Sequence, residues 1–336
     1  MNIEIEKLSF AGCPVMAHLD GLTAKETYEI TITKEGQTVF AERYEPFGTT
    51  LHVDIAEAVA PYVAKPALTE HFADVVTPFD PQGHFAVACG AASTALHILP
   101  GGSIMGNAGY AQWRKKRVPL LVSGYDGTLV HYYRRDLLPV YVMGGESVTI
   151  STEYKTQTFD LKQYEGQIVA LDLDAFDKGM PLYTISQPGK TPMKIGVKPD
   201  VEGKCTSVVS YRNSFGVWER ITLVGGVNIS ETSSSQQAEV LKSYDVMNAV
   251  YSERPSRSSR KRQYTVNTGY LHPEIYSVAI SDMLRSDEVL LKLDSFVSPV
   301  QCAVACEDFL AFTSEDNTTP RGLDLVFTEL REGQYV

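Results

Sequence analysis

Short runs of alternating apolar and polar residues recur along most of the chain. Residues 27–33 alternate cleanly, a turn at Gly36 follows, and residues 38–44 return, which is the pattern of a β-hairpin. The same β-branched and apolar character recurs at residues 51–55, 85–89, 94–99, 139–143, 147–154 and 167–173. Because turn residues separate such runs roughly every 8–12 residues, the pattern predicts β-sandwiches.

The predicted strands group into three blocks. We assign residues 1–112 to a first β-sandwich domain, residues 113–229 to a second, and residues 230–336 to a C-terminal β-rich domain. The clearest helix lies in this last block at residues 273–285, where apolar residues follow Pro273 at helical spacing. The fold class predicted is mainly β, with two β-sandwich-like domains followed by a C-terminal α+β block.

Aromatic residues gather around one predicted hairpin in the second block. Residues 207–211 are extended, residues 213–216 supply turn residues, and residues 218–224 alternate again. Gly216 is free to take a positive φ in that turn. The hairpin is predicted to be structural, with an interaction tip. The candidate interaction residues are Arg212, Asn213, Trp218 and Glu219 of this hairpin, together with Trp113.

Three polar or basic stretches interrupt the strand pattern. Residues 106–117 read as a domain junction, and their basic cluster beside Trp113 hints at an electrostatic contact between subunits. Residues 230–237 are rich in Ser and Gln and are typical of a loop or linker. Residues 254–262 alternate Arg and Lys with Ser, which favours a solvated basic loop over a nucleic-acid contact.

Charge and cysteine usage narrow the class of protein. The 336 residues carry a net charge of −11, which argues against a nucleic-acid binder and suits an assembly component. The start of the chain has neither the basic nor the apolar segment of a signal peptide, and no run is long enough for a membrane span. The 5 scattered Cys residues indicate free thiols in a reducing compartment, so we expect a cytoplasmic or virion-associated protein.

Residues that could carry chemistry are few. Asp172 and Asp174 resemble paired acids, but a strand end followed by a helix cap accounts for them better. Cys302 and Cys306 share a strand face, yet no second pair of ligands lies near them, which favours buried structural thiols over a metal site. The sequence therefore predicts no catalytic residue, no metal and no cofactor.

Two stretches resemble uncharacterised β-rich proteins encoded by phages and prophages of gut bacteria. One is Tyr-Arg-Asn-Ser-Phe-Gly-Val-Trp-Glu-Arg from Tyr211. The other runs from Tyr264-Thr-Val-Asn-Thr-Gly through the predicted helix to Pro299-Val-Gln-Cys. The resemblance covers roughly the last third of the chain and implies a tail-associated structural role without catalysis. The Ser/Arg-rich stretch before Tyr264 departs from that family and suggests a local interaction loop.

The leading expectation is a structural protein that binds other protein subunits in an oligomer or assembly. The alternative is a glycan- or surface-binding module, because exposed Trp113 and Trp218 would stack on sugars. A hydrolase is the third possibility and would depend on unassigned carboxylates such as Asp172 and Asp174.

Overall fold

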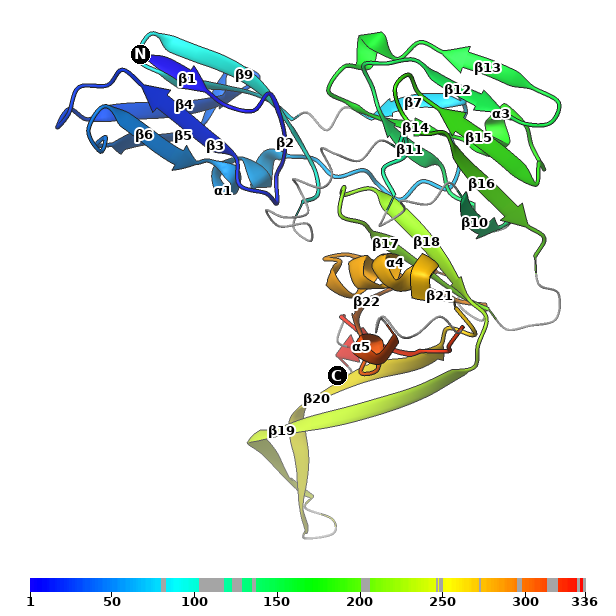
Figure 1. Ribbon diagram of the computed structural model, residues 1–336. Coiled ribbons are helices and arrows are strands. Elements are labelled where there is room, and N and C mark those ends of the chain that lie inside the picture. Colours follow the sequence, from blue (N-terminus) through cyan, green and yellow to red (C-terminus); the bar gives the residue numbers. More distant parts are fainter. Residues whose placement is uncertain are drawn as a thin grey trace. The chain divides into compact units, whose positions relative to one another are not determined.

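The chain is mainly β-strand in the computed structural model (Figure 1), as the alternating pattern predicts. The structure describes residues 1–79, 83–102, 118–122, 129–134, 137–200, 206–245, 247, 250–271, 273–294, 298–312, 320–330 and 333–334. No helix in these ranges is long and apolar enough to cross a membrane.

The first β-sandwich joins a three-stranded sheet, ordered β1-β3-β6, to a five-stranded sheet, ordered β2-β9-β8-β4-β5. Alternate residues of both sheets meet in one core, with Leu19 and Val53 from the first and Ile32, Val87 and Ile98 from the second. The strands are β1 (Asn2–Glu4), β2 (Leu8–Phe10), β3 (Met16–Asp20), β4 (Tyr28–Lys34), β5 (Gln37–Tyr44), β6 (Thr50–Asp54), β8 (His84–Cys89) and β9 (Ala92–Leu99). A short helix, α1 (Ala56–Val59), and a 3-10 turn, η1 (Ala60–Tyr62), follow β6.

The second β-sandwich has the same construction. A three-stranded sheet, β11-β14-β7, shares a core with a five-stranded sheet, β10-β16-β15-β12-β13, and Val142, Val169, Ile150, Ile185 and Ile195 lie in that core. The strands are β7 (Val76–Phe79), β10 (Leu129–Tyr133), β11 (Val140–Met143), β12 (Val148–Ser151), β13 (Thr156–Phe159), β14 (Ile168–Leu171), β15 (Leu182–Ser186) and β16 (Met193–Lys198). The short elements η3 (Lys162–Tyr164) and α3 (Leu173–Phe176) flank β14.

The strand β7 belongs to the second sandwich, although it lies on the other side of the predicted boundary at residue 112. It lies within residues 1–112, yet it pairs antiparallel with β14, with Phe79 opposite Ile168 and Val76 opposite Leu171. The sequence pattern did not predict this strand, because it contains Pro78 and proline is depleted from strand interiors. The second sandwich therefore takes one of its strands from the range assigned to the first.

The C-terminal sheet has eight strands, ordered β18-β17-β21-β22-β23-β20-β19, with β24 also paired to β20. Its helix α4 (Pro273–Arg285) has the bounds that the apolar spacing predicts. The strands are β17 (Ser207–Arg212), β18 (Trp218–Leu223), β19 (Val227–Asp245), β20 (Val250–Asn267), β21 (Val289–Leu293), β22 (Val300–Ala305), β23 (Asp324–Glu329) and β24 (Gly333–Gln334), and a short helix α5 (Phe309–Phe312) follows β22.

Contacts between Cα atoms divide the chain into two compact units. Both sandwiches lie in unit 1. The turn that joins β17 to β18 also belongs to unit 1, whereas the predicted boundary at residue 229 falls inside unit 2. Unit 1 comprises Met1–Val201, Tyr211–Arg220 and Val278–Ser286, and unit 2 comprises Glu202–Ser210, Ile221–Ser277 and Asp287–Val336.

Within unit 2, β19 and β20 form a long antiparallel ribbon (Figure 1). They contain 19 and 18 residues, against about 5–6 in an ordinary strand. The predictions of a linker at residues 230–237 and a basic loop at residues 254–262 are therefore wrong. Serine-rich and arginine-rich stretches have weak strand propensity alone. Cross-strand pairing runs from Val227 opposite Val266 to Asp245 opposite Val250, with a register shift between Gln236 and Val240.

Candidate functional site

Asn213 organises the turn between β17 and β18. Its side-chain oxygen accepts hydrogen bonds from the backbone N–H groups of Phe215 (2.9 Å) and Val217 (3.3 Å). Its side-chain nitrogen donates to the carbonyl oxygen of Leu121 at 2.8 Å. Asn213 is only 2% exposed, so these bonds satisfy an amide that is closed off from water.

Two glycines let this turn approach the backbone of the first sandwich. Gly216 has a φ of 75°, which confirms the predicted positive φ. A Cβ atom on Gly216 would lie 2.6 Å from the backbone nitrogen of Gly101, and one on Gly101 would lie 2.4 Å from the carbonyl carbon of Phe215. Neither position has room for a side chain, so the turn is a tight packing contact inside unit 1.

The other candidate interaction residues of the hairpin are buried as well. The Arg212 guanidinium carbon lies 4.5 Å from the centroid of the Trp218 ring, and its Nη1 donates to the carbonyl oxygen of Gly216 at 3.2 Å. The Trp218 indole N–H donates to the Pro66 carbonyl at 2.9 Å. Glu219 is 5% exposed. The predicted interaction tip is therefore a packing corner, and Trp113 lies outside the described residues.

Helix α4 holds the same turn through a carboxylate. The backbone N–H and the hydroxyl of Ser214 both donate to Asp282 Oδ2, at 3.1 Å and 2.6 Å. Asp282 is 4% exposed, and the charge-assisted bonds compensate for its burial. The sequence showed the turn and the helix separately but gave no sign that they meet.

Asp172 and Asp174 have separate partners within the fold. Asp172 caps α3, where its Oδ1 accepts from the Ala175 N–H at 3.0 Å, and its Oδ2 accepts from the Phe72 N–H at 2.7 Å. Asp174 instead pairs with Arg134 at 2.9 Å. The helix-cap interpretation is confirmed, and each carboxylate has its own internal partners.

The cysteines have the environment of structural thiols. Burial, with a smaller effect from the Glu329 carboxylate, raises the pKa of Cys302 to about 12, so its reactive thiolate form is disfavoured. Cys306 lies just beyond β22 and is partly exposed. Among the described residues, no group of three or more His, Cys, Asp or Glu side chains is placed to hold a metal ion.

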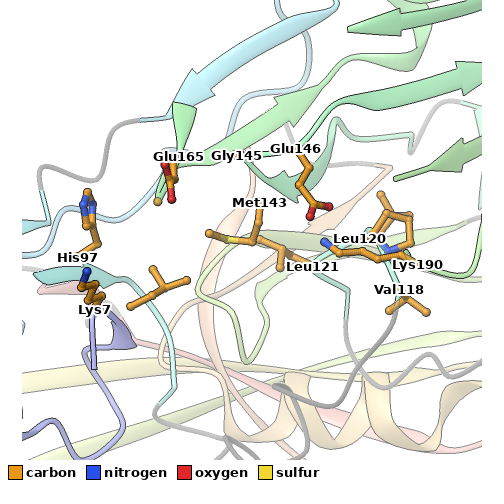
Figure 2. A pocket seen from close by; sticks show the side chains of 14 residues that line it. Lys7, His97, Val118, Leu120, Leu121, Met143, Gly145, Glu146, Glu165 and Lys190 are labelled. Carbon is orange, nitrogen blue, oxygen red and sulfur yellow. The ribbon is translucent and has the colours of Figure 1, made fainter. Parts of the chain in front are cut away.

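One pocket of about 740 Å³ opens in unit 1 (Figure 2). Leu120, Leu121 and Met143 supply apolar lining. Charged and titratable groups lie at two ends, with Lys7, His97 and Glu165 at one and Glu146 and Lys190 at the other. Burial lowers the pKa of Lys190, and the nearby Glu146 carboxylate opposes that shift.

The pocket has the size of a small-molecule site, and two of its titratable side chains have neighbours of their own within the fold. Lys190 donates to Gln187 at 2.8 Å, and the His97 ring packs against His84, with 4.2 Å between centroids. The lining contains both positive and negative side chains, so it favours neither an anionic nor a cationic ligand. The pocket was not predicted, because its lining residues are scattered from Lys7 to Lys190.

The ribbon of β19 and β20 is the other candidate site. Strand β20 pairs with β23 at Gln263–Asn267 and with β24 at Ser259 and Arg260. Farther out, the described strands that pair are β19 and β20 alone, and β19 ends the strand order of the sheet. The backbone edge of a strand is a template for pairing with another strand.

Comparison with known proteins finds no matching protein-family model and no matching curated protein.

Proposed function

We propose that the chain is a structural subunit that binds other protein subunits, with a phage-tail-associated assembly as its setting. The observation that carries this proposal is the β19/β20 ribbon. An isolated two-stranded ribbon is marginally stable in water, and three or more strands with a packed face are the usual minimum. The outer part of the ribbon, beyond the residues of β20 that pair with β23 and β24, is therefore expected to gain stability when another chain adds to it.

The rest of the chain supports a structural role. The four candidate residues of the β17/β18 hairpin are engaged in internal packing, and the two carboxylates considered for hydrolysis cap or pair within the fold. The glycan-binding alternative required an exposed Trp218 ring for stacking on a sugar, and Trp218 is buried. Neither the glycan-binding alternative nor the hydrolase gains a specific observation.

Sedimentation velocity over a range of protein concentrations tests the proposal. We expect the full chain to form larger species as concentration rises. A shortened variant, in which Asn-Gly replaces residues 235–258 and joins Ser234 to Ser259, keeps the register at its new end because these two residues are paired. This variant should stay monomeric with unchanged thermal unfolding. A full chain that remains monomeric at every concentration would contradict the proposal.

A further inference from the structure

The two strands of the ribbon differ sharply in sequence. Residues 232–238 of β19 read Thr-Ser-Ser-Ser-Gln-Gln-Ala and contain no charge and no proline. The partner strand β20 contains Pro255 and a concentration of basic residues. These basic residues are Arg254, Arg257, Arg260, Lys261 and Arg262.

This difference matters because proteins protect strand edges in recognisable ways. Lysine, other charges and proline on an edge strand prevent further strands from adding to it. By that criterion Pro255 and the basic residues protect β20, whereas residues 232–238 of β19 have no charge and no proline, and depart from regular pairing at the register shift between Gln236 and Val240. Among the described strands, β19 also ends the strand order of the sheet. Within the residues that the structure describes, β20 alone pairs with β19, so the other side of β19 is the edge at which a further strand is expected to pair.

We propose that β19 pairs antiparallel with β19 of a second copy of this chain, across a two-fold axis within residues 232–238. This inference rests on the proposed structural role and names the partner. An isologous contact is self-complementary, and the uncharged Ser/Thr/Gln stretch meets itself without repulsion. An axis at Ser235 is disfavoured, because it would place Glu231 opposite Glu239 of the second copy.

The distribution of charge favours pairing of β19 with β19 over pairing of β20 with β20. Pairing β20 with β20 would bring the basic stretch at residues 254–262 against its own copy, and like charges on adjacent strands are destabilising. Pairing β19 with β19 gives a four-stranded sheet in the order β20-β19-β19-β20, with the two basic strands at its outer edges. Four strands also exceed the three needed for independent stability.

A cysteine scan of residues 232–238 in the full chain locates the axis. In a symmetric antiparallel pair one residue lies opposite itself, and only there do the two Cα atoms come within disulfide range. We expect one position to form a covalent dimer under mild oxidation, with loss of cross-linking two residues away. Peptide mapping separates this product from any bond through the chain's own cysteines.

A charge substitution gives an independent test with a matched control. Ser235 and Ser258 are directly paired across the ribbon, so Ser235→Lys and Ser258→Lys add the same charge at the same distance along it. We expect Ser235→Lys to weaken dimerisation, with partial recovery at high salt, and Ser258→Lys to leave it unchanged.

The outcomes separate this inference from the proposed function. A full chain that assembles while no position in residues 232–238 cross-links, or that responds equally to both lysines, overturns the β19 contact and leaves the structural role standing. A chain that stays monomeric overturns both.

Discussion

The two hairpins that follow the sandwiches have opposite characters. The turn between β17 and β18 is short and rich in aromatic residues, and unit 1 surrounds it. Asn213, Gly216 and Ser214 are each fixed by contacts from a different part of the chain. The β19/β20 ribbon is long and polar, and over its outer part the pairing described is between its own two strands. One hairpin is held by contacts within unit 1, and the other includes the strand that ends the order of the described sheet.

The largest effect should come from a methyl group at the buried turn. Gly216→Ala places a Cβ atom 2.6 Å from the Gly101 nitrogen at a φ of 75°, so both strain and steric conflict arise. We expect a loss of about 3–5 kcal/mol in the free energy of unfolding. Urea denaturation measures it.

Gly36 provides the control for that substitution. It has a similar φ of 78°, but an added Cβ atom would meet nothing within 4 Å. Gly36→Ala should therefore cost only about 1–2 kcal/mol, the strain alone. Equal losses at the two positions would show that the close approach to Gly101 is unimportant.

The second-largest loss in the free energy of unfolding is expected when the side-chain amide of Asn213 is removed. Asn213→Ala deletes the acceptor for two backbone N–H groups and the donor to Leu121, all in a buried setting. We expect a loss of about 3 kcal/mol. The matched change Asn228→Ala, at an exposed position of β19, should alter the free energy of unfolding by less than about 0.5 kcal/mol. A loss of similar size for both variants would break the contrast between the hairpins.

Tyr264 connects the base of the ribbon to β23. Its hydroxyl donates to the Glu329 carboxylate, and burial together with that bond raises the pKa of Tyr264 to about 12. Because the folded-state pKa lies above the usual value of about 10, the unfolded state ionises first, and stability falls as pH rises from about 10 to 12. Tyr264→Phe should cost about 1 kcal/mol at neutral pH and make that alkaline loss shallower. An unchanged alkaline slope would contradict this role.

The smallest effect on stability is expected in the ribbon. At protein concentrations where the chain is monomeric, Ser235→Lys should change the free energy of unfolding by less than about 0.5 kcal/mol, because the core residues described for both sandwiches all lie outside the ribbon. Thermal unfolding of the dilute variant measures this. A large loss would mean that the ribbon supports the fold and is not a separate binding element.

Local patterns predicted the fold well and the candidate sites poorly. Period-two alternation and β-branched runs identified β4, β5, β6, β8 and β9 of the first sandwich and β11, β12 and β14 of the second, but not β10, β13 or β15. Apolar spacing after Pro273 gave the bounds of α4. The strand β7 was not predicted, because Pro78 interrupts its alternating pattern. Its pairing with β14 joins residues that are far apart in the chain. Long-range pairing of this kind has no local signature.

The exposure of the candidate interaction residues was also predicted wrongly, because contacts between distant parts of the chain bury them. Arg212 and Glu219 look solvent-facing by type, yet the ring of Trp218 and the hydroxyl of Tyr211 compensate for their burial. The ribbon was missed because a run of serines resembles a linker. The signal available was the pair of flanking runs, Val240–Tyr244 and Val250 onward, in which Tyr244 lies opposite Tyr251.

Hydrogen–deuterium exchange at several protein concentrations tests the central contrast most directly. The account predicts that the amides of Phe215 and Val217 exchange slowly at every concentration, because Asn213 accepts from both of them. It predicts that amides at residues 232–238 change from fast to slow exchange as concentration rises and a second strand covers the edge of β19. Exchange in that segment that does not depend on concentration, in a chain that otherwise assembles, would contradict the ribbon as the binding element.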